Sequence, residues 1–107
     1  MASPATFLVL YATPNDPEAF DHHYEQVHTP LARALPGLRS YTLGRHPVTM
    51  RGDATYYLAA TLRWDTIAEL RAAFATPEGH AAAEDMQTLT LLTTVTSIIY
   101  TEDAASP

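Results

Sequence analysis

Apolar positions along the chain alternate between strand-like and helix-like spacing. Residues 6–12, "TFLVLYA", are β-branched, aromatic and aliphatic, and the turn residues "TPNDP" follow them. Residues 39–47, "RSYTLGRHP", and 55–64, "TYYLAATLRW", predict two further strands. Residues 88–101, "TLTLLTTVTSIIYT", are rich in threonine and β-branched side chains, which favours a last strand over a helix.

A first helix is expected after residue 16, because Asp16 can cap it and Pro17 suits its first position. Its buried face is predicted from apolar positions at helical spacing, namely Phe20, Tyr24, Val27, Leu31 and Leu35. Pro30 lacks a backbone N–H and biases the residue before it away from helical geometry. A kink or short break is therefore expected directly after His28, and "LPGL" ends the element.

A second helical region lies between the third and last strands. Asp65 or Thr66 caps its start, and Thr66 with Glu69 forms a capping box. Its apolar face comprises Ile67, Leu70 and Phe74. The segment "TPEGHAAAEDM" then restarts a short helix, with Thr76 as its cap and Pro77 at its first position.

The resulting order, βαββαβ, is typical of a ferredoxin-like α+β fold with a four-stranded antiparallel sheet. We expect a single domain over residues 1–107, with a core at about residues 6–101 and a tail at 102–107. Two helices can cover only one face of such a sheet. Because the strands are apolar on both faces, we expect a homodimer to cover the other.

Composition narrows the function. The 107 residues are 47% hydrophobic and 17% charged, as in a folded globular protein. No apolar run approaches the roughly 18 residues of a membrane helix, and the start lacks the basic region of a signal peptide, so no membrane association and a cytoplasmic location are expected. Twelve acidic residues against six basic ones, a formal charge of −6 without a basic cluster, argue against nucleic-acid binding.

Several chemistries are excluded by missing residues or motifs. The chain has no cysteine, which removes disulfides, zinc-thiolate sites and thiol nucleophiles. All six basic residues are arginines, so no lysine is available for a Schiff base. Neither a G-x-S-x-G elbow nor a glycine-rich nucleotide cradle is present, and no cofactor is expected.

The segment "DPEAFDHHYEQVHTPLARALPGL", residues 16–38, contains three histidines. His22 and His23 diverge too far on a helix to bind one metal, and no pair has the i,i+4 spacing of helical ligands, so no metal site is expected and both are interpreted as solvated. His28 lies on the flank of the buried face. Its ring could bond a backbone carbonyl freed by Pro30, or it could act as an acid/base, because imidazole changes charge near neutral pH.

Two stretches resemble the EthD family, named for ethyl tert-butyl ether degradation. The first, residues 10–41, carries a D-x-x-x-F-x-x-x-Y-x-x-x-H-x-P-L pattern and P-G-L, here Asp16, Phe20, Tyr24, His28, Pro30, Leu31, Pro36, Gly37 and Leu38. The second, residues 56–85, is similar to the family's third strand, second helix and S/T-P-E-G-x-A-x-x-x-D signature, which ends at Asp85. We expect Asp85 to be structural, holding a backbone amide or capping a helix.

The resemblance implies a dimeric α+β barrel, in which two ferredoxin-like sheets close face to face. That superfamily includes muconolactone-type isomerases, polyketide cyclases, cofactor-free monooxygenases and haem enzymes. In methylmuconolactone-type relatives, a histidine at this helix position and a tyrosine 13 residues later are, as the resemblance implies, the active-site pair. Here they are His28 and Tyr41, although Tyr41 could instead be a strand aromatic with a surface hydroxyl.

The first hypothesis is a cofactor-independent isomerase, cyclase or lyase acting on a small aromatic, lactone or polyketide-like substrate. His28 would be its general acid/base, and Tyr41 would stabilise an oxyanion. The expected substrate-binding residues are Tyr11, Tyr24, His46 and Tyr57. Two alternatives remain open: a cofactor-free or haem-using monooxygenase, and a non-catalytic small-molecule binding or accessory protein.

Overall fold

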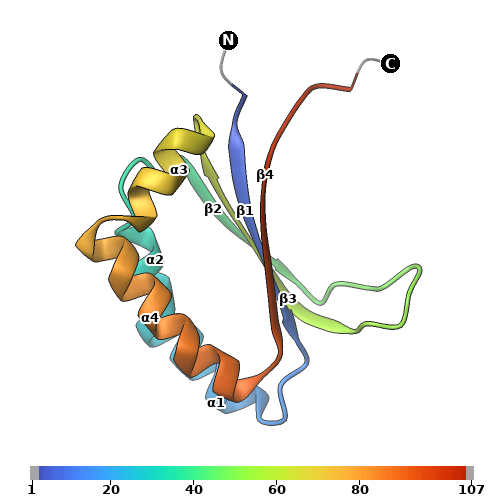
Figure 1. Ribbon diagram of the computed structural model, residues 1–107. Helices are drawn as coiled ribbons and strands as arrows, with labels where there is room; N and C mark the ends of the chain where they lie inside the picture. Colours follow the sequence, from blue (N-terminus) through green and yellow to red (C-terminus); the bar gives the residue numbers. More distant parts are fainter. Residues whose placement is uncertain (1–2, 106–107) are drawn as a thin grey trace.

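The computed structural model describes residues 3–105 and has the predicted α+β arrangement. Its elements are β1 (Ala5–Ala12), α1 (Pro17–His23), the π-helical turn η1 (Tyr24–His28), α2 (Thr29–Arg33), β2 (Ser40–Arg45), β3 (Tyr56–Trp64), α3 (Ile67–Phe74), α4 (Pro77–Leu92) and β4 (Val95–Thr101). The strands form one antiparallel sheet in the order β2-β3-β1-β4. The helices all lie on one face of this sheet (Figure 1), as in the ferredoxin-like fold.

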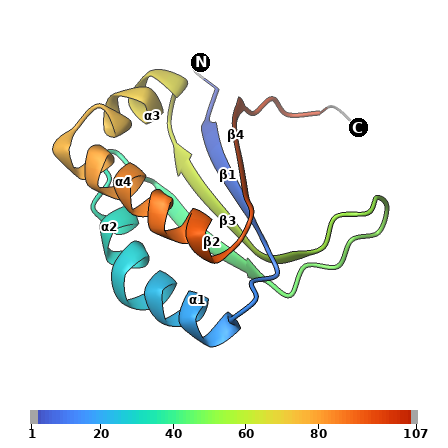
Figure 2. The ribbon, with the colours of Figure 1, turned by 60° about the horizontal axis from the view of Figure 1, so that its bottom comes forward.

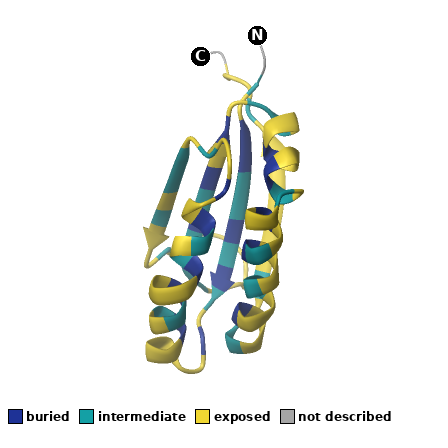
Figure 3. Ribbon diagram, turned by 90° about the vertical axis from the view of Figure 1, so that its left-hand side faces the viewer, coloured by how far each residue is buried: buried dark blue, intermediate teal, exposed yellow. Residues whose placement is uncertain are grey.

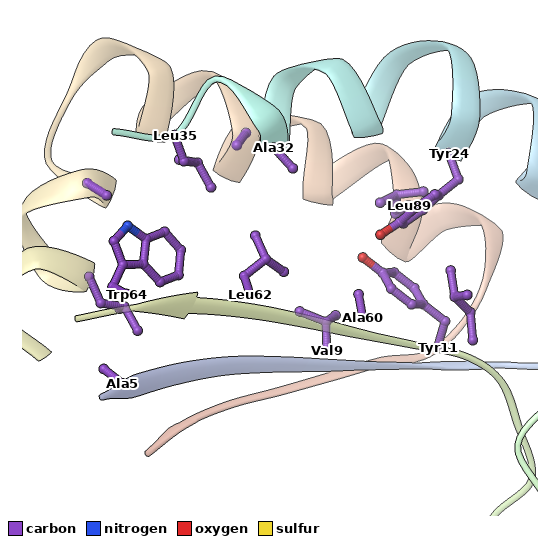
Figure 4. Close-up of a cluster of buried hydrophobic side chains, with 14 of the residues drawn as sticks. Ala5, Val9, Tyr11, Tyr24, Ala32, Leu35, Ala60, Leu62, Trp64 and Leu89 are labelled. Atoms are coloured by element: carbon purple, nitrogen blue, oxygen red, sulfur yellow. The ribbon is translucent and has the colours of Figure 1, made fainter. Parts of the chain in front are cut away.

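The core lies between the sheet and the helices. Buried positions follow the central strands, while the outer turns of the helices are exposed (Figure 3). Figure 4 shows the aromatic and aliphatic side chains that fill the layer, with Trp64 at one end and Tyr11 and Tyr24 at the other. The Trp64 indole donates a hydrogen bond to the Pro36 carbonyl at 2.8 Å, so the "LPGL" turn is fastened to β3.

The expected break after His28 does not occur. His28 and Thr29 both have helical dihedral angles, and the chain stays helical from Pro17 to Arg33. Instead the Thr29 N–H bonds the Tyr24 carbonyl, five residues back, which is π-helical spacing. A wider turn directly before Pro30 accommodates the ring without leaving the helix.

The π turn also changes which residues are buried. An α-helical pattern predicted Val27 in the core, but Val27 is 40% exposed. One turn after Tyr24 the buried residue is instead His28, followed by Ala32. The prediction for Val27 was wrong because a π turn adds one residue and rotates everything after it.

The predicted last strand, residues 88–101, was wrong in its first part. Helix α4 continues to Leu92, and β4 begins only at Val95. Ala82 and Leu89 are buried at helical spacing, whereas Thr88 and Thr90 face solvent. Packing of this apolar face outweighs the weak helix propensity of threonine.

The second face of the sheet is not covered by any described element (Figure 1). It carries apolar side chains that are half-buried or exposed, among them Leu8, Leu10, Ile98 and Tyr100.

Beyond β4, Glu102 is held in place, since its N–H donates to the Pro4 carbonyl at 2.9 Å and its carboxylate accepts from the Thr6 hydroxyl. Among residues 3–105, no helix has the length and apolar character needed to cross a membrane.

Candidate functional site

A cavity of about 400 Å³ lies between the sheet and the helices. Its walls are mostly apolar side chains from β1, β3, β4, α2, α3, α4 and the turn after α2, namely Phe7, Val9, Ala32, Leu35, Ala60, Leu62, Leu70, Phe74, Ala82, Ala83, Met86 and Ile99. The remaining lining residues are Tyr11, Tyr24, His28 and Arg71. A mostly apolar cavity with a few polar groups is the usual form of a small-molecule binding site.

His28, the last residue of η1, is 6% exposed and lines this cavity. Its Nδ1 lies 2.9 Å from Asp85 Oδ2. Its Nε2 has no hydrogen-bond partner among the described residues. Among the same residues, every fully buried side-chain nitrogen or oxygen does have a partner. Nε2 is therefore not fully buried, and it belongs to a ring that lines the cavity.

Asp85 joins two histidines. Helix α4 runs beside the α1–α2 region (Figure 2), and the Asp85 carboxylate reaches His23 Nε2 at 2.8 Å as well as His28. The predictions that His23 is solvated and that Asp85 only holds a backbone amide or a cap were therefore wrong. Residues five apart face the same way across a π turn, so η1 allows both rings to meet one carboxylate.

Among residues 3–105, no group of three or more histidine, aspartate or glutamate side chains has the geometry to hold a metal ion. His22, the neighbour of His23, is exposed.

Burial lowers the pKa of His28 below its usual 6.5, since the surroundings disfavour the charged ring, and the Asp85 carboxylate opposes this effect. The ring is therefore neutral near neutral pH and has a lone pair available. A neutral imidazole beside a carboxylate suits a general base, because the carboxylate stabilises the imidazolium that forms.

Three tyrosine hydroxyls gather beside the cavity. The Tyr24 and Tyr41 hydroxyls are hydrogen-bonded, and Tyr11 points its hydroxyl toward Tyr24 (Figure 4). Desolvation is the main cause that raises the pKa of each of these phenols. They remain protonated at neutral pH, so they can donate hydrogen bonds but do not act as bases.

The structure separates the sequence-predicted site residues into two groups. Tyr11, Tyr24 and His28 line the cavity, whereas Tyr41 lies behind Tyr24 and is not a lining residue. Tyr57 is also not among the lining residues. It donates to the Asp21 carboxylate at 2.9 Å and packs against Phe20.

His46 lies at the end of β2, exposed and with a positive φ of 55°. It is not among the cavity residues. The left-handed turn that follows β2 leaves its side chain in solvent, so the structure does not bring this predicted substrate-binding residue to the cavity.

Sequence reasoning missed part of the wall. Phe7 and Phe74 pack edge to face at 5.2 Å and border the cavity, as do Met86 and Arg71. The alternation of β1 could have identified Phe7, because it shares a face with Val9 and Tyr11. Met86 is the last residue of the predicted short helix "TPEGHAAAEDM", but nothing in that local pattern marks it as part of a cavity wall.

Comparison with known proteins identifies close relatives. The EthD domain model matches residues 12–90. An uncharacterized 11.0 kDa protein in the thcB-thcC intergenic region of Rhodococcus erythropolis is 36% identical over 78 residues, 73% of this chain and 76% of the relative. An EthD family protein from Bacillus halodurans is 34% identical, with a TM-score of 0.82 over 94% of this chain and 99% of that chain.

Two more distant solved structures share the fold. SnoaB from Streptomyces nogalater, described as a cofactor-independent oxygenase, is 22% identical with a TM-score of 0.64, over 99% of each chain. The hydroxynitrile lyase from Passiflora edulis is 12% identical with a TM-score of 0.76, over 100% of each chain. At these identities the similarity concerns the fold alone, and the fold hosts enzymes of different reaction types.

Proposed function

This chain belongs to the EthD family, and from its cavity we propose that it is an enzyme that moves a proton on a small, largely apolar molecule, with His28 as the acid/base. One observation carries the proposal. A buried imidazole has one nitrogen hydrogen-bonded to a carboxylate and the other without a partner among residues 3–105, in a ring that lines an apolar cavity of about 400 Å³. A reaction of isomerase, cyclase or lyase type would use this arrangement.

The proposed chemistry starts at a C–H or O–H bond of the substrate. His28 Nε2 takes that proton, and the electron pair is left on the substrate as an enolate or alkoxide. Tyr24 or Tyr11 donates its O–H to the new oxyanion, and Tyr41 supports Tyr24 from behind. Return of the proton to another carbon completes an isomerisation. In a cyclisation the enolate carbon first attacks a carbonyl of the same molecule, and the proton goes to the alkoxide that forms. In a lyase reaction the electron pair expels a leaving group, which takes the proton from His28.

We also propose that the open sheet face is covered by a second copy of the chain. The face carries an apolar patch on the adjacent strands β1 and β4, where exposed Ile98 and Tyr100 lie beside Leu8 and Leu10. An exposed apolar surface of this kind favours association, and a two-fold pairing of one face with itself is the simplest closed arrangement.

A deuterium-exchange assay tests the chemistry without knowledge of the natural substrate. The probe is 2-tetralone, a bicyclic ketone small enough for the cavity, whose α-protons exchange measurably in D₂O by NMR. A positioned acid/base contributes roughly 10²- to 10⁴-fold in rate, so His28→Gln should lower the enzyme-dependent exchange by that order. His22→Gln, an exposed neighbour on the same helix, is the matched control and should keep full activity.

Equal exchange by wild type and His28→Gln would remove His28 from the mechanism. If a panel of lactones and aryl ketones binds tightly but none exchanges, the protein is a binding or accessory protein and not an enzyme of this class.

A second candidate function is a cofactor-independent oxygenase, which the likeness of fold to SnoaB favours. There His28 would deprotonate a phenol or hydroquinone, and the resulting anion would react with dioxygen. Oxygen consumption with a hydroquinone probe separates the two functions, because proton transfer alone consumes none.

A further inference from the structure

We propose that Asp85 is a positioning residue: it holds His28 in the tautomer that carries its proton on Nδ1, and His23 anchors the same carboxylate from its other side. This inference rests on the proposed role of His28 as a base. It adds the hydrogen bond that would leave the lone pair of His28 on Nε2, available to the cavity. It also assigns a role to Asp85, the aspartate at the end of the family's second signature.

The hydrogen bonds determine which ring nitrogen of His28 carries the proton. A carboxylate has no proton to give, so each imidazole nitrogen that contacts it must be the donor. Asp85 Oδ2 lies 2.9 Å from His28 Nδ1, which must therefore carry the hydrogen. A neutral imidazole has only one N–H, so the lone pair is on Nε2, the nitrogen that has no partner in the part of the chain that the structure describes.

The assignment is informative because it reverses the usual preference. A neutral histidine side chain in water favours a proton on Nε2. In that form His28 would present an N–H to a ligand and could not accept a proton from it. Asp85 thus determines whether the cavity contains a base or a donor.

His23 has the corresponding role on the other oxygen. Its Nε2 donates to Asp85 Oδ1 at 2.8 Å, and its ring is partly exposed. Two contacts on two oxygens fix the plane of a carboxylate that is itself only 9% exposed. With His23 present, the carboxylate has little freedom to rotate away when His28 becomes charged.

The other groups near His28 do not compete for Nδ1. The ring of Tyr24, one turn before it on the helix, packs against the imidazole at 5.2 Å between centroids. The hydroxyl of Tyr24 is bonded to Tyr41 of β2, and that of Tyr11 of β1 donates to Met86 Sδ at 3.7 Å. The charges that act on His28 are therefore Asp85 of α4 and, when protonated, His23 of α1.

Nitrogen NMR of the histidine rings tests the inference in the 107-residue chain, with no substrate required. At mildly alkaline pH, the two-bond proton–nitrogen spectrum of wild type should show His28 with a protonated Nδ1 and a bare Nε2. A bare Nδ1 with protonated Nε2 in wild type would overturn the proposal, and this observation requires no variant to fold.

Variants separate the hydrogen bond from the charge. Asp85→Ala should shift His28 toward the Nε2–H form and lower its pKa further, because the carboxylate that raises it is removed. Asp85→Asn can still accept from Nδ1–H, so it should keep the tautomer but lower the pKa, while its amide N–H moves the His23 proton to Nδ1. Glu84→Gln, an exposed neighbour on α4, is the control and should change neither property.

Asp85→Ala with an unchanged His28 tautomer and pKa would refute the proposal. The outcome is independent of the exchange assay. A correct tautomer together with full activity of His28→Gln would refute the proposed function alone, and a wrong tautomer together with loss of activity in His28→Gln would refute the role of Asp85 alone.

Discussion

Replacement of Gly79 by alanine should destabilise the fold markedly. Gly79 lies in the first turn of α4, where that helix meets the end of α3. A Cβ built there would lie 2.3 Å from the Ala73 carbonyl oxygen and 2.5 Å from Phe74 Cα. All of these neighbours are backbone atoms, so no side chain can rotate away to make room.

The magnitude follows from that distance. Reaching an ordinary contact of 3.4 Å requires the two helices to separate by about 1 Å. Overpacking of this kind costs about 1–3 kcal/mol, and occasionally more, while alanine's better helix propensity returns at most about 1 kcal/mol. Three backbone atoms lie 2.3–2.7 Å from the added Cβ, so we expect a cost at the upper end of that range and a net loss of about 2 kcal/mol. For a chain of this size such a loss lowers Tm by roughly 8–16 °C.

The assay is urea unfolding followed by circular dichroism, at equal protein concentrations because association would also affect stability. His80→Ala, the next residue and exposed, is the matched control and should stay within about 0.5 kcal/mol of wild type. If Gly79→Ala were as stable as His80→Ala, the close approach of α3 and α4 would not exist in solution.

Three further predictions concern titration and assembly. In a spectrophotometric titration, the buried Tyr11, Tyr24 and Tyr41 should ionise above pH 10, because desolvation raises the pKa of each, and their ionisation near pH 10 would contradict the buried hydroxyl cluster. Because the folded-state pKa of His28 is lowered, the unfolded chain binds more protons below pH 6.5, so the unfolding free energy should fall as pH drops below 6.5, by up to about 1.4 kcal/mol per pH unit. His28→Gln should lose this slope and His22→Gln should keep it. Ile98→Asp should convert a dimer into monomers by light scattering, whereas Leu91→Asp, on the outer surface of α4, should not, and a wild-type monomer would refute the proposed pairing.

The order of elements could be predicted from the sequence because each strand and helix start has its own local signal. Asp16, Thr66 and Thr76 all accept a backbone N–H with the side chain, as capping chemistry requires. The end of α4 could not be predicted in this way. Its threonines favour a strand locally, and only the packing of Leu89 against the rest of the core decides otherwise.

The candidate site was predictable only in part, for a related reason. An α-helical wheel places His23 and His28 on different sides, and nothing in the local sequence specifies a π turn before Pro30. Once η1 is present, both rings face α4, and the pairing with Asp85, about 60 residues away in the chain, becomes possible. Contacts between distant segments depend on helix phase, and one extra residue in a turn changes that phase.

The most direct test is a crystal structure with 2-naphthol, a planar mimic of the enol of 2-tetralone, bound to the protein. We predict that its rings occupy the cavity beside Phe7, Phe74 and Met86, and that its oxygen lies within hydrogen-bond distance of His28 Nε2 or of the Tyr24 or Tyr11 hydroxyl, with Nε2 facing the ligand. A naphthol seated in the cavity while Nε2 points into protein or bulk water would contradict the account.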